Sequence, residues 1–314
     1  MKIQQLRFLC EISRRDLSVS AAAEALHTSQ PGVSRQIKDL EEELGVEIFV
    51  RHGKRLTALT DPGRAVLAIA ERILAEAANM KRAGEEFANE KLGTLTIATT
   101  HTQARYALPK AVAAFKRRYP DVQLVIHQGN PTQICEMVLR GEAEFAIATE
   151  QIAQYPELVS LPCYQWNRCV VVPAGHPLAK VKPLTLEAVA NYPIVTYDFA
   201  FANRSLVEKA FEQRGLKPKV VLTALDADVI KTYVELGLGV GIMAAMAFNA
   251  KRDQGLKALD ASHLFESSTT RLGIKRGAYL RRYAYEFIEF FAPHLPRSIV
   301  EPAVTGAEGS SYEL

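Results

Sequence analysis

Over residues 1–45 the apolar positions recur at helical spacing, which predicts three short helices. Ser18 precedes the second helix and can cap it, because its hydroxyl can accept from a free N–H of the first turn. Pro31, a residue favoured in the first turn, opens the third helix, and Gly45 ends it. The positions that we expect to be buried are Ile3, Leu6, Leu9 and Ile12 in the first helix and Val33, Ile37, Leu40 and Leu44 in the third.

The third helix changes in charge along its length. Arg35 and Lys38 precede Glu41, Glu42 and Glu43. Because DNA phosphates repel carboxylates, only the N-terminal half of this helix can enter a groove, as the recognition helix of a helix-turn-helix does. The alternative is a small helical domain whose charges are only solvated, since two helices joined by a short turn are common.

The segment after Gly45 predicts a basic hairpin. Residues 46–60 have the pattern of two short strands around His52 and Gly53, with three basic side chains near the tip. A basic hairpin beside a recognition helix is a wing, so we predict a winged helix-turn-helix over residues 1–59. The residues expected at DNA are Thr28, Ser29, Gln30, Pro31, Ser34, Arg35, Lys38, Arg51, Lys54 and Arg55.

A single long helix is expected over residues 60–90, because an acid and a proline at its start are helix-entry signals. Its apolar side follows a seven-residue repeat, although Glu76 interrupts the stripe. Such a stripe in a segment too thin for its own core favours a dimer-forming linker helix. Packing against the rest of the same chain is the alternative. The repeat consists of Val66, Ile73, Met80 and Phe87.

Strands and helices alternate from Gly93 onward, which predicts an α/β domain of parallel sheets covered by helices over residues 91–314. Two such sets follow each other along the chain. Subdomain I is expected at about 91–161 and 266–295, and subdomain II at about 162–265. Because the chain crosses between them, a cleft should lie at their boundary, where ligands bind at the carboxyl ends of strands.

A dense polar cluster follows the first strand of this domain. Thr100, Thr102 and Gln103 lie between that strand and a helix, and Thr149 follows another strand, so both sets should face one edge of the first sheet. Free N–H groups of a first helical turn, together with hydroxyls, can hold an anion without any cation. Helix capping is the simpler use of such residues, but it needs only one of them. We therefore predict a site for a small oxyanion or a carboxylate.

Composition narrows the function classes. The 38 basic and 35 acidic residues nearly balance, so a nucleic-acid surface must be local. The four cysteines form no C-x-x-C pair and His101 has no obvious ligand set, so no metal site is expected. Asp226 and Asp228 begin a helix, where they favour its dipole rather than acid–base chemistry, and no nucleophile–base pattern indicates an enzyme. The amphipathic N-terminus and the lack of a long apolar run predict a cytoplasmic protein without a membrane span.

Residues 21–51 resemble the signature of the LysR-type transcriptional regulators across helix, turn, recognition helix and wing. Residues 99–106, 226–241 and 268–277 are similar to the CysB group within that family, so the resemblance extends over nearly the whole chain. It implies an effector domain of two subdomains, like that of periplasmic binding proteins. It also implies a homotetramer that activates promoters of sulfate assimilation and cysteine biosynthesis. The implied partners are double-stranded DNA and, as a candidate, RNA polymerase.

The same resemblance implies what the cleft binds. Acetylserine is the inducer in such proteins, sulfate or thiosulfate can occupy or oppose the site, and no further cofactor is implied. This group usually has a threonine where the chain has Ala202, so Asn203 or Ser205 would have to replace that hydroxyl. By position the effector ligands would be Thr100, Thr102, Gln103 and Thr149, with Trp166 nearby from the second subdomain.

Three alternatives stay open at this point. A regulator that answers another anion or carboxylate would share all of these features. A solute-binding protein shares the cleft of two subdomains but requires export. An α/β enzyme requires positioned acid, base or metal groups.

Overall fold

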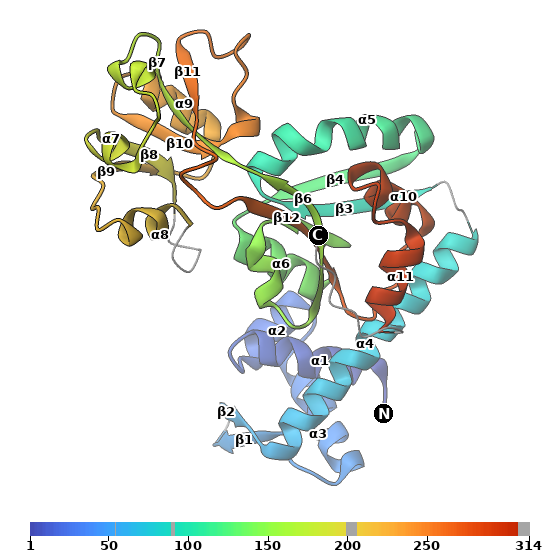
Figure 1. Cartoon of the computed structure of the whole chain (residues 1–314). Helices are drawn as coiled ribbons and strands as arrows, with labels where there is room; N and C mark the ends of the chain where they lie inside the picture. The colour runs from blue at the N-terminus through green and yellow to red at the C-terminus, as the bar shows by residue number, and fades with distance from the viewer. Residues whose placement is uncertain (54, 89–91, 199–205, 307–314) are drawn as a thin grey trace. The chain divides into compact units, whose positions relative to one another are not determined.

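The computed structural model describes residues 1–53, 55–88, 92–198 and 206–306, and the chain divides into two compact units, Met1–Ala88 and Asn89–Leu314 (Figure 1). No helix among these residues is both long enough and apolar enough to cross a membrane. Four residues named above, Lys54, Ala202, Asn203 and Ser205, lie outside the described residues.

The first unit consists of a helix-turn-helix, a hairpin and a long helix. Two predicted helix boundaries are confirmed: Ser18 Oγ accepts from the N–H of Ala21, and Gly45 ends the third helix in the left-handed conformation with φ 67°. Ser29 Oγ likewise accepts from the N–H of Gly32. The elements of this unit are α1 (Ile3–Arg14), α2 (Val19–Ala25), α3 (Gln30–Leu44), β1 (Phe49–His52), β2 (Arg55–Leu59) and α4 (Asp61–Ala88).

The core of the first unit lies between α1, α2 and α3. Two of the positions predicted to be buried are wrong, since Ile3 is 48% exposed and Leu44 is 39% exposed. They lie in the first turn of α1 and the last turn of α3, where each helix extends past the elements that cover it. The predicted positions that are buried are Leu6, Leu9, Ile12, Val33, Ile37 and Leu40.

The apolar stripe of α4 is covered over only part of its length. Val66 and Ile73 pack against the core of the first unit, and Ala70 between them is buried. Farther along, Met80 is 77% exposed and Phe87 is 88% exposed. Packing on the same chain therefore accounts for the N-terminal part of the stripe and leaves its C-terminal part on the surface of the unit.

Glu41 attaches the wing to α3. Its Oε1 accepts from the N–H of Ile48 at 2.9 Å and of Phe49 at 3.2 Å, and its Oε2 accepts from Arg51 at 2.6 Å. The start of α4 fits tightly against the same segment, because a Cβ on Gly63 would lie 2.0 Å from the Ile48 carbonyl oxygen. One of the acids in the C-terminal half of α3 thus has a structural role.

The second unit contains two five-stranded sheets, and the first has the order β4-β3-β5-β12-β6. Strand β3 (Gly93–Thr99) is parallel to β4 (Val122–Gln128) and β5 (Phe145–Ala148). Strand β12 (Ser268–Lys275) is antiparallel to β5 and to β6 (Leu158–Trp166). The predicted parallel sheet is therefore mixed, because β12 is the strand by which the chain returns rather than part of a βαβ unit.

Helices cover both faces of the first sheet. On one face α5 (Leu108–Arg118) and α10 (Arg282–Phe291) share a core, and α6 (Pro131–Arg140) covers the other face (Figure 1). The sequence analysis did not include α11 (Arg297–Thr305), which packs beside α10 and adds buried apolar residues to the same core.

The second sheet has the order β11-β7-β10-β8-β9, with β8 parallel to β9 and β10 and with β7 antiparallel to β10 and β11. The sequence analysis missed β11. The strands are β7 (Arg168–Pro173), β8 (Ile194–Tyr197), β9 (Val220–Ala224), β10 (Val240–Ala244) and β11 (Leu256–Asp260), and the α-helices are α7 (Leu186–Ala190), α8 (Leu206–Gln213) and α9 (Ala227–Glu235).

The chain crosses twice between the two sheets. The first crossing joins β6 to β7 at Asn167, and the second runs from β11 back to β12. Trp166 pairs with Ser268 inside the first sheet. Subdomain I therefore extends past the boundary expected near residue 161, and Trp166 belongs to it rather than to subdomain II. No glycine or proline marks this end, and only Asn167 separates β6 from β7.

Candidate functional site

The residues predicted to contact DNA lie at the start of α3 and on the wing. The side of α3 that they occupy borders a groove between this helix and the wing, which is also lined by Glu41, Glu42 and Glu47. Of the predicted residues that the structure describes, Ser34 is half-buried and the exposed ones are Thr28, Ser29, Gln30, Pro31, Arg35, Lys38, Arg51 and Arg55.

Some basic side chains of this surface are paired with acids, and others are not. Arg51 and Lys38 are paired with acids of α3, at 2.6 Å and 3.4 Å. Arg35 and Arg55 form no ion pair in the part of the chain that the structure describes. An unpaired guanidinium gives up no protein contact when it meets a phosphate or a guanine edge. Arg35, which lines this groove, thus keeps its charge without an acid partner among the described residues.

The polar cluster after β3 lies beside the end of β5. The two strands are parallel neighbours, so Thr100 and Thr149, which follow them, meet at one edge of the first sheet. Both side chains are half-buried, and the Thr149 hydroxyl does not cap the 3-10 turn η2 (Glu150–Gln154). The helical segment after β3 begins at His101 and passes through a π-helical turn, η1 (Gln103–Ala107). Its first N–H groups are therefore available at the same edge.

Two aromatic residues border this edge. Thr102 is buried near the hydroxyl of Tyr197, which ends β8 in subdomain II and accepts from the N–H of Ala244 at 3.3 Å. The indole Nε1 of Trp166 is buried and has no hydrogen-bond partner among the described residues. A buried donor without an acceptor is costly, and an indole N–H can only donate. The sequence analysis missed Tyr197, although its place at a strand end is the signal that identified Thr100.

The side chain of Gln103 points into subdomain I. It is buried, its Nε2 donates to Thr270 Oγ1 at 3.1 Å, and its Oε1 accepts from the hydroxyl of Tyr164. The amide thus joins η1 to β6 and β12. The contact that this residue can offer a ligand without breaking these bonds is its backbone N–H in the first helical turn.

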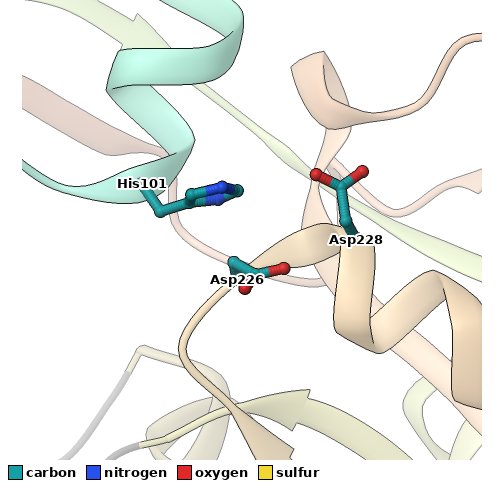
Figure 2. A group of neighbouring side chains, drawn as sticks. All are labelled: His101, Asp226 and Asp228. Carbon is teal, nitrogen blue, oxygen red and sulfur yellow. The ribbon is translucent and has the colours of Figure 1, made fainter. Parts of the chain in front are cut away.

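The structure also brings together residues that the sequence analysis treated separately. Figure 2 shows His101, after β3, facing Asp226 and Asp228 at the start of α9, and one ligand atom from each lies within 4.8 Å of the others. Asp226 caps α9 by accepting from the N–H of Val229 at 2.9 Å, as expected of an acid at a helix start. His101 Nδ1 is buried and has no hydrogen-bond partner within the described residues.

Two cationic side chains contact the carboxylate of Asp228. Arg105 Nε lies 2.7 Å and Lys231 Nζ 3.1 Å from its carboxylate, and Tyr106 donates to it at 2.8 Å. Burial alone would raise the pKa of Asp228, but hydrogen bonds from Tyr106 and Lys231, with the charges beside it, outweigh burial and lower this pKa. Two cations would compete with a metal ion for this carboxylate. The arrangement therefore favours an ionic link between the subdomains over a metal centre.

Comparison with known families accounts for both units. Residues 3–64 match the family described as bacterial regulatory helix-turn-helix protein, lysR family, and residues 88–296 match the LysR substrate binding domain. The chain belongs to the LysR family. This LysR-type protein is therefore a DNA-binding transcriptional regulator with a domain for a small-molecule effector, and it is not an enzyme.

Individual relatives show which group within the LysR family this regulator resembles. The regulator is 57% identical to the HTH-type transcriptional regulator CysB of Burkholderia cenocepacia over 314 residues, which cover 100% of both chains. It is also 57% identical over 295 residues to the regulator SsuR of the same organism, which covers 94% of this chain and 96% of the relative. The crystal structure of the cofactor-binding domain of the Cbl transcriptional regulator matches 69% of this chain and 95% of that domain, with 42% identity and a TM-score of 0.66. The resemblance to the CysB group is confirmed.

Gln103→Ala should destabilise the second unit, because Tyr164 and Thr270 lose a buried partner, at a cost of about 1–3 kcal/mol. Urea unfolding of the full chain, followed by the fluorescence of its single tryptophan, Trp166, reports on this unit. Gln123→Ala on the exposed side of β4 is the matched control and should change stability by less than about 0.5 kcal/mol. If Gln103→Ala is as stable as the wild type, the amide has no structural role and is free to serve a ligand.

Proposed function

We propose that this regulator activates genes of sulfate assimilation and cysteine biosynthesis in response to a small anion, namely acetylserine, sulfate or thiosulfate. The identity of 57% to CysB over the whole chain supports this set of genes. Because the chain is equally identical to another regulator, SsuR, the second candidate is a LysR-type regulator that answers another anion or carboxylate.

The proposal of an effector site here rests on the indole N–H of Trp166, which is buried and has no hydrogen-bond partner among the described residues. It lies at the end of β6, at the boundary of the two subdomains. The hydroxyls of Thr100 and Thr149 and a helix N-terminus lie at the ends of β3 and β5, on the same edge of this sheet. Such a set of uncharged donors and helix dipole suits a carboxylate or a small oxyanion.

We place the N-terminal turns of α3 in a major groove of DNA and the wing along its backbone. The exposed residues from Thr28 to Lys38 then face the duplex, and Arg35 reaches the base edges. Glu41, Glu42 and Glu43, which follow on α3, then lie at the rim of the DNA major groove. There the Glu41 carboxylate binds the wing.

We further propose a homotetramer. Met80 and Phe87 continue the stripe of α4 beyond its covered part, and a second copy of this helix would bury them. Each copy would then contact two others through separate apolar surfaces, one on each unit, which closes a tetramer. The second surface is an exposed apolar stripe on β9 and α9, formed by Val220, Val221, Leu225, Val229, Tyr233 and Leu236.

The effector acts, in this proposal, by favouring one angle between the two subdomains and so changing how the tetramer spaces its wings along DNA. We expect N-acetylserine, at a saturating concentration, to change both the length of the DNase I footprint and the bend angle of promoter DNA. A footprint and a bend that stay the same with and without effector would contradict this mechanism.

Arg35→Ala should weaken promoter binding about 10- to 100-fold, because a guanidinium that contacts a base is lost. Fluorescence anisotropy with labelled promoter DNA measures the affinity. Arg15→Ala is the control, since Arg15 is exposed at the end of α1 and already paired with Glu11 at 2.9 Å. Effector binding should be unchanged in both variants, and an unaltered DNA affinity in Arg35→Ala would refute the proposed docking.

Thr102→Ala should reduce the stabilisation that an effector gives, because a hydroxyl beside the helix N-terminus is lost. The measurement is a thermal-shift panel with acetylserine, sulfate and thiosulfate, in which the affinity should fall about tenfold or more. Thr102→Ser keeps the hydroxyl and should keep the shift, and Thr94→Ala at the exposed start of β3 is the control. A panel without any shift in the wild type would remove the effector assignment.

A further inference from the structure

Arg168 connects the two crossings between the subdomains. It is the first residue of β7, directly after the first crossing. Its Nη1 donates to the carbonyl oxygen of Glu266 at 3.0 Å and its Nη2 donates to Ser268 Oγ at 2.9 Å, both on the segment that returns to subdomain I. One guanidinium therefore holds both crossings.

The charge of Arg168 is not paired with an acid. Its guanidinium forms no ion pair within the described residues, and the carboxylate of Glu150, whose charge reaches it, accepts a hydrogen bond from the N–H of Thr269. Burial lowers the pKa of Arg168, which the charge of Glu150 only partly offsets. A partly buried cation without a counter-charge is unfavourable, and an anion that reaches it lowers this cost.

Arg168 lies beside the same edge of the first sheet as the donors described above. Its guanidinium carbon is 5.1 Å from the centre of the Trp166 ring. Its charge also acts on the hydroxyl of Tyr197, which lies near Thr102. A guanidinium has more N–H donors than its bonds to Glu266 and Ser268 use, so donors remain for a ligand.

We propose that Arg168 is an effector-binding residue that reads the negative charge of a carboxylate or small oxyanion next to the indole N–H of Trp166. This inference rests on the proposed function, because it requires an anionic effector in the cleft. The guanidinium that would bind the anion also connects the two crossings. Binding of a negative charge at Arg168 can therefore change the angle between the subdomains.

The first measurement uses the wild-type full chain. Titration calorimetry compares N-acetylserine, which carries a carboxylate, with N-acetylserinamide, which is neutral, and uses sulfate as a second anionic probe. We expect the carboxylate to bind about 10- to 100-fold more tightly than the amide, as for hydrogen bonds to a charged group. Equal affinities would overturn the role of Arg168. If neither N-acetylserine nor sulfate binds, the effector part of the proposed function itself fails.

Arg168→Gln removes the charge and keeps an amide that can donate to the crossing. The affinity for N-acetylserine and sulfate should fall about 10- to 100-fold, while the affinity for the neutral amide should change less than about threefold. Arg168→Lys should keep part of the preference for anions. Arg105→Gln is the matched control: Asp228, at 2.7 Å, already balances the charge of Arg105, so the preference should survive.

Two outcomes would overturn the proposal while the effector function stands. A purely structural role of Arg168 would lower the affinities for the acid and the amide alike. If the helix N-terminus alone recognises the negative charge, Arg168→Gln would still bind N-acetylserine more tightly than the neutral amide. Thermal unfolding without ligand checks the fold of each variant, and if Arg168→Gln does not fold, Arg168→Lys and the wild-type comparison of acid with amide decide.

Discussion

The parallel pairing of β3 with β5 is the constraint on which the effector site depends. Thr99 lies opposite Ile147 in register, and its buried hydroxyl donates to the Ile147 carbonyl oxygen at 2.8 Å. This pairing fixes where both strands end, so Thr100 and Thr149 come to the same edge together with the start of a helix. A shift of this register would separate the donors that can share one anion.

Several polar contacts cross the boundary between the subdomains, beside the ring of Tyr106, which packs against the core of subdomain II. Asp228 binds Arg105 and Tyr106 across the boundary, and the hydroxyl of Tyr197 lies near Thr102. Water or a ligand can replace such contacts at a modest net cost, whereas separating buried apolar surfaces would be expensive. A boundary joined in this way is suited to two arrangements of similar free energy, which is what an effector needs in order to shift their populations.

The DNA-binding unit separates charge along one helix. The unpaired guanidinium of Arg35 lies in the half of α3 that carries no acid, while Glu41 in the other half binds two backbone N–H groups of the wing and the Arg51 side chain. The acid that would repel phosphate is thereby neutralised and made part of the scaffold. The N-terminal half of α3 thus attracts DNA, and its C-terminal half attaches the wing.

Local pattern in the sequence determined the helices of the first unit, their caps at Ser18 and Gly45, and the polar strand ends around Thr100, because each depends on neighbours within a few positions. Only the tertiary structure decided that Leu44 is exposed, that Trp166 belongs to the first sheet and that Gln103 is used inside subdomain I. It alone also brought Arg168 to Glu266, because a side chain on one crossing meets its partner on the other only after nearly a hundred intervening residues have folded.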